Sequence, residues 1–396
     1  MTSHNPAASP EALAPVLPIL DAFVAETLPG GGIDGSRSLW QAPGRGAGNS
    51  LFPGDVDVRY LRFLVEGLYR AAGPLRRDGY RDVADAHVRW MAGAMRPNHP
   101  SWALGNALEM IGVHHVFRPR DEGLVAAARQ MVAWLNERRV QVTTTDGVSF
   151  WHYPCGYGVL DAQDAGWTND LSMVGSGLVW AHEVTGDAAM LESAASFAEY
   201  FVQPWRPNAL GADGYWQCGT FREDLGSWVV GPAHFSGFES TDAYADEVSW
   251  VFSTMTCTDF LVKLYRHRPD PRYLDCCVAA ALWTFRQAQF DDGGVGMCGR
   301  DDKWLGLTGN AVSQVAMLLP LLPHTHRDRA ELVAGARLAW SYLEAHLPGA
   351  SLGSHGVEWV TGTTSTDPLV NVGMLWAAAV LGWLNGLEAL EHPTPG

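Results

Sequence analysis

Cysteine is scarce in this chain of 396 residues, and its six cysteines do not form the dense framework of a disulfide-stabilised secreted domain. No Cys-x-x-Cys or His-x-x-x-His pair occurs, so we expect no metal site. Phosphate-binding glycine loops, dinucleotide fingerprints and serine nucleophile elbows are also missing, so we expect no cofactor. The residues that could in principle converge on zinc are scattered along the chain: His152, Cys155, Cys218, His234 and Cys298.

Long hydrophobic runs and positive charge are scarce as well. No apolar run approaches the roughly 20 residues that span a bilayer. The N-terminus has no basic region, and Pro15, Pro18 and Asp21 interrupt its apolar stretch, so we expect no secretory signal and a cytoplasmic location. The formal net charge of -16 argues against nucleic acid or an anionic membrane as partner. It is compatible with a homo-oligomer, and with a small anionic ligand held by a few local Arg or Lys residues.

What the chain does contain is a repeat. An outer-type helix, an often long loop and an inner-type helix built on small residues recur about six times. This alternation predicts an all-α fold, an (α/α)6 toroid of six helical hairpins, in a single domain over residues 1–396 with a flexible tail at 1–10. The expected outer helices lie near 11–28, 78–95, 121–138, 188–203, 272–289 and 328–346. The expected inner helices lie near 55–72, 101–117, 168–185, 242–266, 307–322 and 367–388.

Small residues distinguish the inner helices from the outer ones. A helix with neighbours on both sides needs apolar or small residues around most of its circumference, and the stretches 172–180 and 370–376 have them. Glycine inside a helix costs roughly 1 kcal/mol relative to alanine, so its repeated use predicts close approach between neighbouring helices. The charged face of residues 121–136 is typical of an outer helix.

The loops that lead from outer to inner helices are expected to form the active site. They are long, whereas the reverse connections at 185–187 and 267–270 are short, and long loops inside a compact domain usually carry function. In a toroid these long loops gather at one mouth of the ring.

Aromatic and polar residues alternate in these loops. Several of the 17 Trp residues lie there beside Asp, Asn, Arg and His. This mixture suits a sugar, because its apolar faces stack on indole rings and its hydroxyls need polar partners. Indole rings also stabilise carbocations, which keeps a terpenoid substrate open, and the same residues could simply pack the loops onto the helices. The expected substrate-binding residues are Trp102, His152, Tyr153, Trp167, Trp216, His234, Arg300, Lys303, Trp304 and His355.

Asp170 is the first candidate for acid/base catalysis. The segment 166–170 predicts the start of an inner helix, which places Asp170 in the first turn. There its carboxylate either faces the cavity as a general acid or base, or only complements the positive end of the helix dipole.

Asp302 and Asp246 are the other two candidates. Asp302 lies in a cluster with Arg300 and Lys303, which either holds an anionic group or forms a solvated salt network. Asp246 lies one helical turn from Asp242, where it could supply the second carboxylate of an acid/base pair or only solvate the start of a helix.

Residues 169–173, continuing to 183–187, resemble a segment of six-hairpin glycosidases related to the unsaturated glucuronyl hydrolases. In that family an Asp at the start of an inner helix is catalytic, and the helix closes with a Thr-Gly-Asp turn. The resemblance covers one hairpin. It implies that Asp170 protonates an enol-ether double bond so that water can add.

Residues 293–303 are similar to the Gly-Gly-Phe…Gly-Arg…Lys segment of protein prenyltransferase β subunits and terpenoid-cyclase toroids. This second resemblance implies that Arg300 and Lys303 bind a diphosphate. The sequence departs from the prenyltransferase pattern, because Gly306 to Thr308 stand where the zinc-binding Asp and Cys are expected. The cyclase Asp-x-Asp-Asp acid is also missing.

The acid-rich mouth favours a carbohydrate over a terpenoid, whose pocket should be more apolar. We therefore expect an enzyme that acts on a carbohydrate or uronide, by hydrolysis or elimination, with carboxylate acid/base catalysis. The alternatives are an isoprenoid cyclase, isomerase or dehydratase, and a non-catalytic glycan-binding toroid.

Overall fold

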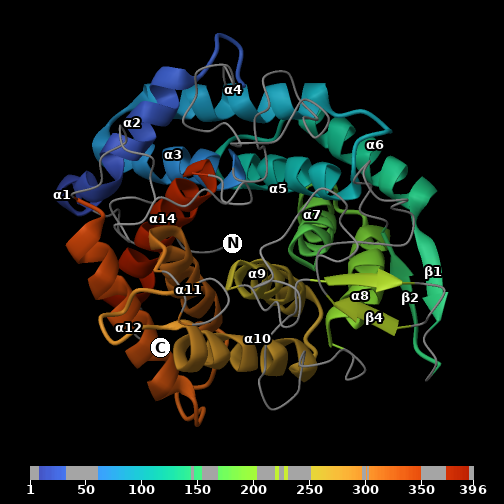
Figure 1. Ribbon diagram of the computed structural model, residues 1–396. Coiled ribbons are helices and arrows are strands. Elements are labelled where there is room, and N and C mark those ends of the chain that lie inside the picture. Colours follow the sequence, from blue (N-terminus) through green and yellow to red (C-terminus); the bar gives the residue numbers. More distant parts are fainter. Residues whose placement is uncertain are drawn as a thin grey trace. The chain divides into compact units, whose positions relative to one another are not determined.

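The computed structural model describes residues 9–32, 61–143, 147–153, 168–202, 219–222, 227–230, 251–296, 300, 303–348 and 372–391. Helices make up most of these ranges (Figure 1). The chain divides by its internal contacts into two compact units. Unit 1 comprises Met1–Ala94 with Gln287–Gly396, and unit 2 comprises Met95–Arg286.

Unit 2 is built around three inner helices, α5, α7 and α9. Helix α7 packs against both α5 and α9, and the outer helices α6, α8 and α10 pack against this row. Figure 1 shows α8 between α7 and the β1–β2 hairpin. The helices are α5 (Ser101–Phe117), α6 (Glu122–Arg138), α7 (Thr168–Thr185), α8 (Ala188–Val202), α9 (Val251–His267) and α10 (Pro271–Trp283), which continues into the π-helical turn Thr284–Ala288.

Burial separates inner from outer helices as the sequence predicted. Every residue of α5 from Ser101 to His114 is buried. Helix α6 instead buries one side and leaves charged residues exposed. Asp121 caps α6, because its carboxylate accepts hydrogen bonds from the backbone N–H groups of Gly123 (2.9 Å) and Leu124 (3.3 Å).

Glycines bring α5 and α7 into backbone contact. A Cβ atom on Gly105 would lie 2.5 Å from the carbonyl oxygen of Met173, and one on Gly177 would lie 2.6 Å from that of Gly105. Further along, a Cβ on Gly112 would lie 2.3 Å from the ring of Trp180. The contacts advance together along both helices, so α5 and α7 run parallel. The predicted role of glycine in close helix approach is confirmed here.

Unit 1 has the same construction, with α14 packed between α11 and α3. A Cβ on Gly309 would lie 2.4 Å from the carbonyl oxygen of Ala378, and one on Gly382 would lie 2.3 Å from the Cα of Gly309. Helices α4 and α12 cover α3 and α11 respectively. The elements are α1 (Pro10–Leu13), the 3-10 turn Ala14–Val16, α2 (Leu17–Glu26), α3 (Leu61–Leu75), α4 (Asp78–Ala94), α11 (Leu305–Leu318), α12 (Arg329–His346), α14 (Val372–Gly386) and the π-helical turn Leu387–Glu391.

Two short antiparallel hairpins are the only sheets in the described part of the chain, and the sequence did not predict them. Strand β1 (Val140–Thr143) pairs with β2 (Ser149–His152), and β3 (Gly219–Arg222) pairs with β4 (Ser227–Val230). Each strand has four residues, which is too short for an alternating pattern to stand out from a loop.

Each expected helical range contains a helix. Helix α3 extends beyond its expected end to Leu75 and includes Pro74 in its last turn. Helix α11 begins at Leu305, slightly earlier than expected. The expected start of the inner helix at 242 and most of the tail at 1–10 lie outside the described residues. None of the described helices combines the length and apolar character needed to cross a membrane.

Candidate active site at the N-terminal ends of the inner helices

In unit 2 the N-terminal ends of α5 and α7 lie next to each other. Gly105 contacts Met173 across the interface between these parallel helices. Trp102 precedes Gly105 by three residues, and Asp170 precedes Met173 by the same number. Since both helices rise by the same amount per residue, Trp102 and Asp170 lie at the same level on neighbouring helices.

Asp170 occupies the predicted place in the first turn of an inner helix. Helix α7 begins at Thr168, so Asp170 is its third residue. A carboxylate there is stabilised by the first-turn N–H groups, which favour its ionised form. Only the backbone of Asp170 is described, so its role in proton transfer stays a prediction.

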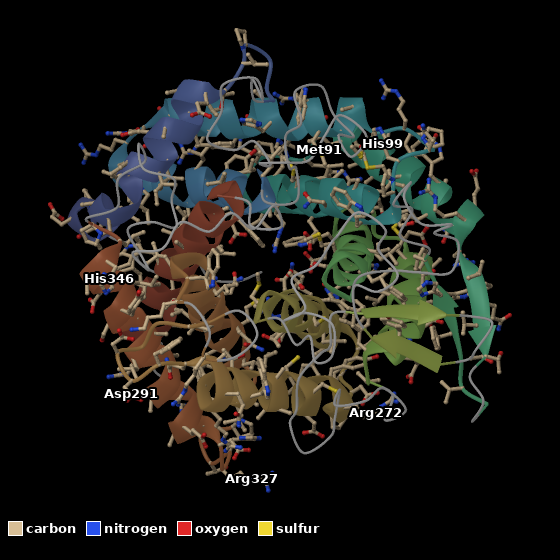
Figure 2. The ribbon with its side chains drawn as sticks, viewed as in Figure 1. Met91, His99, Arg272, Asp291, Arg327 and His346 are labelled. Atoms are coloured by element: carbon tan, nitrogen blue, oxygen red, sulfur yellow. The ribbon has the colours of Figure 1, made fainter. Side chains whose placement is uncertain are left out.

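The loop that leads into α5 carries a histidine at this end of unit 2. Arg138, the last residue of α6, donates a hydrogen bond to the carbonyl oxygen of His99 (2.5 Å) and another to that of Pro97. Figure 2 shows His99 next to α6. Partial burial, together with the charges of Arg96 and Arg138, lowers the pKa of His99. The imidazole is therefore neutral at neutral pH, where it can both donate and accept a hydrogen bond.

His152 and Tyr153 lie together, but deep in the protein against the outer helix α8. The His152 ring is 5.7 Å from the ring of Tyr200, and the Tyr153 ring is 5.1 Å from that of Phe197. Burial lowers the pKa of His152 to about 4 and raises the pKa of Tyr153. Both side chains are buried and pack against α8 beside the β1–β2 hairpin.

In unit 1 the start of α11 is anchored by Trp304, its N-cap residue. The Trp304 backbone N–H donates to the carbonyl oxygen of Val295 (2.9 Å), and the Thr308 hydroxyl donates to the carbonyl oxygen of Trp304 (2.8 Å). The Val295 N–H in turn donates to the Thr308 hydroxyl (3.0 Å). No side chain caps the first-turn N–H groups of α11 among the described residues, and an indole has no acceptor to offer them.

Lys303 precedes this helix and is ion-paired with Asp292. Burial acts to raise the pKa of Asp292, but hydrogen bonds from Lys303 and from the Gly294 N–H outweigh it and hold the pKa below its usual range. The lysine charge is thus balanced, which weakens the diphosphate-binding role implied by the second resemblance. Arg300 is exposed.

The remaining candidate site residues lie outside the residues that the structure describes. They are Asp246, Asp302, Trp167, Trp216, His234 and His355. Cys155, Cys218 and Cys298 also lie outside the described residues, whereas Cys257, Cys276 and Cys277 are buried and form no disulfide. Among the described residues no group of three or more His, Cys, Asp or Glu side chains is arranged to hold a metal ion.

A buried ionic cluster that sequence reasoning missed joins the three inner helices of unit 2. Lys263 of α9 donates to Asp259 (2.5 Å) and to Ser176 of α7 (2.9 Å), and its Nζ lies 3.9 Å from a carboxylate oxygen of Glu109 on α5. These residues occupy the middle and C-terminal half of their helices. The cluster therefore joins the helices at positions further toward their C-terminal ends than Asp170. The i,i+4 pair of Asp259 and Lys263 was the signal for it in the sequence.

No protein-family model matches the sequence, and no curated protein matches it. Solved structures do share its fold. An inactive α-1,6-mannanase variant from Salegentibacter sp., with two aspartates replaced by asparagine and α-1,6-mannotriose bound, gives a TM-score of 0.65 at 11% identity over 95% of this chain and 98% of that chain. An unsaturated glucuronyl hydrolase from Bacillus sp. gives 0.63 at 14% identity over 96% and 95%. One from Streptococcus agalactiae gives 0.60 at 14% identity over 96% and 94%.

These likenesses establish the fold of the chain. It is all-α, the (α/α)6 toroid of six helical hairpins, as the repeat predicted. The resemblance to the unsaturated glucuronyl hydrolases is confirmed at the level of the fold. Identities of 11–14% say nothing further about activity.

Proposed function

We propose that the chain is an enzyme that acts on a carbohydrate or uronide through carboxylate acid/base catalysis, by hydrolysis or elimination. The observation that carries this proposal is the placement of Asp170 and Trp102 at one level, on the first turns of two parallel inner helices. A carboxylic acid and an indole on the first turns of neighbouring helices suit proton transfer to a stacked sugar.

The neighbours in fold support this class of substrate. The mannanase variant with two Asp-to-Asn changes is inactive and binds α-1,6-mannotriose. A Streptococcus agalactiae glucuronyl hydrolase with one Asp-to-Asn change is complexed with dGlcA-GalNAc6S. In both proteins the replaced residues are aspartates and the bound ligand is a saccharide.

In the proposed mechanism Asp170 is the group that transfers the proton, and the negative charge of its partner carboxylate keeps it protonated against the effect of the first-turn N–H groups. On a glycosidic bond it protonates the leaving oxygen, and on an unsaturated uronide it protonates the double bond so that water adds. Asp246, which belongs to the same unit, is the proposed partner carboxylate. Trp102 is the proposed platform for an apolar sugar face, and His99 a hydrogen-bond partner for a hydroxyl.

The first prediction concerns Asp170→Asn. The amide keeps the shape and the acceptor oxygen but cannot exchange a proton, so turnover should fall by a factor on the order of 100 to 10,000. The free energy of unfolding should change by less than about 1 kcal/mol, the usual effect of a charge lost at a helix start, so the thermal midpoint should shift little. Turnover is measured on α-1,6-mannotriose, on dGlcA-GalNAc6S and on a prenyl diphosphate.

Asp187→Asn is the matched control. Asp187 caps the outer helix α8 by accepting from the Ala189 N–H (2.9 Å), so it shares the helix-start chemistry without the inner-helix position. This variant should keep its turnover. Wild-type turnover in Asp170→Asn would remove Asp170 from the mechanism, and turnover of the prenyl diphosphate alone would replace the carbohydrate proposal.

A further inference from the structure

Arg138 connects the end of an outer helix to the turn that precedes the inner helix α5. It is the last residue of α6, and its Nη1 atom donates to the carbonyl oxygen of His99 (2.5 Å), while Nη2 donates to that of Pro97. The same turn is closed by a hydrogen bond from the His99 N–H to the carbonyl oxygen of Arg96 (3.1 Å). One guanidinium group therefore holds this turn at two points.

The sequence of the turn limits the hydrogen bonds that it can make by itself. Pro97 and Pro100 have no backbone N–H, so neither can donate. Pro100 is the N-cap of α5, and no side chain among the described residues caps this helix end. Residues 96–98 are exposed, so burial does not fix them either. The contacts with Arg138 thus order a segment that its own residues leave weakly constrained.

An arginine is suited to this task. Its planar guanidinium presents N–H donors in fixed directions, so two contacts on one turn set its orientation as well as its distance. Partial burial lowers the pKa of Arg138, and the neighbouring Glu137 acts to raise it, but a guanidinium stays charged in either case. A lysine would keep the charge and lose the fork.

The charge of Arg138 can be separated from its hydrogen bonds. Burial is the largest cause of the lowered pKa of His99, and the charges of Arg96 and Arg138 add to it. Arg96 lies in the turn itself and donates to the carbonyl oxygen of Met95 (2.6 Å). Arg96 therefore acts on His99 by its charge, whereas Arg138 also holds the backbone.

We propose that Arg138 is a positioning residue of the active site, which fixes the direction in which the His99 side chain meets a substrate hydroxyl. This inference rests on the proposed function, in which His99 is the partner of that hydroxyl. It adds a residue of an outer helix that acts through His99 without touching the substrate. Both residues belong to unit 2.

The test compares Arg138→Lys with Arg96→Gln in the full-length enzyme at pH 8, where His99 is neutral with or without these charges. Arg138→Lys should raise KM for the saccharide that the wild type turns over by roughly 3- to 10-fold, the usual effect of one hydrogen bond. Its kcat should stay unchanged, because the contact is made before and during the reaction alike. Arg96→Gln, which keeps the fork, should keep the wild-type KM. Arg138→Gln is measured in parallel and should show the same rise as Arg138→Lys.

A double-mutant cycle asks whether the effect passes through His99. His99→Ala should raise KM by a similar factor. In that background Arg138→Lys should change KM by less than about 2-fold, because residues that act through one contact are not additive. A role in folding alone would not produce this pattern.

Arg139→Lys is the structural control at the adjacent position. Arg139 donates to the Ser193 hydroxyl (3.0 Å), and its guanidinium lies 4.1 Å from the centre of the Trp151 ring. Both Arg138→Lys and Arg139→Lys lose guanidinium contacts, so both should lower the thermal midpoint. Only Arg138→Lys should raise KM.

The probes are α-1,6-mannotriose and dGlcA-GalNAc6S, and two failures are distinguishable. If the wild type acts on neither probe, the proposed function fails and this inference fails with it. If the wild type acts on a probe while both Arg138 variants keep its KM within about 2-fold, Arg138 is not a positioning residue and the proposed function stands. An equal rise in KM with and without His99 would also overturn the inference.

Discussion

Two histidines are held neutral by their surroundings. In unit 1 the Gly32 N–H donates to Nδ1 of His87 (3.3 Å), which leaves the proton on Nε2, 2.9 Å from the Thr27 hydroxyl. Burial lowers the pKa of His87 to about 4, as it does for His152 in unit 2. Both folded-state pKa values lie below the ordinary value of 6.5. Between pH 4 and pH 6.5 the unfolded chain therefore binds more protons than the folded chain.

Stability should therefore be lost as pH falls. Above about pH 6.5 these histidines make no pH-dependent contribution, and from there to pH 4 each lowers the free energy of unfolding by up to about 3 kcal/mol. Thermal midpoints measured from pH 8 to pH 4 should be flat and then decline. His87→Gln should flatten part of the decline, whereas replacing the exposed His324 should not. An unchanged profile in His87→Gln would show that His87 is not held neutral.

Only part of the site could be predicted from single residues. Asp170 was placed correctly in a first turn because Gly-Trp-Thr-Asn-Asp is a readable helix start. His152 and Tyr153 looked like loop residues, yet they are buried against α8, because His152 ends a strand too short to recognise and Tyr153 directly follows it.

At the scale of elements, the glycine contacts between inner helices lead to the third prediction. Gly105→Ala places a Cβ against the backbone of Met173, which cannot move aside as a flexible side chain can. We expect it to lower the free energy of unfolding by about 1–3 kcal/mol. Gly93→Ala on α4 is the control, since its Cβ would meet nothing within 4 Å. That change should be neutral or stabilise by about 0.5–1 kcal/mol in denaturant unfolding.

The ionic cluster of unit 2 gives the fourth prediction. Lys263→Met leaves the buried carboxylates of Asp259 and Glu109 without their cation, so the free energy of unfolding should fall by about 3–5 kcal/mol. Arg272→Met breaks the more exposed pairs with Glu199 and Asp270 and should cost less than about 1 kcal/mol. Equal losses in urea unfolding would mean that Lys263 adds no more stability than a surface ion pair.

The helices were predictable because the helical spacing of apolar residues repeats several times along each of them. The hairpins were not predictable from the sequence. Helix α5 matches its expected range, and every residue from Ser101 to His114 is buried. Strands β1 and β2 offer four residues each, so their pairing depends on tertiary contact with α8.

At the scale of the whole molecule, the single domain over residues 1–396 is our proposal, and it gives the fifth prediction. Thermal unfolding should show one transition, with equal calorimetric and van't Hoff enthalpies. Lys263→Met, although it lies in unit 2, should then lower the midpoint of the entire transition. Two resolved transitions, of which only one responds to Lys263→Met, would contradict the proposal.

The parallel inner helices also bear on how such a chain can diversify. In unit 2 the connections that leave the C-terminal ends of α5, α7 and α9 are short, covering 118–121, 186–187 and 268–270. The segments that precede α7 and α9 are much longer, as is the one that precedes α14 in unit 1. Insertions and exchanges at the N-terminal ends can therefore accumulate while the helices keep their glycine contacts. The loops of this scaffold can therefore change with little cost to its stability.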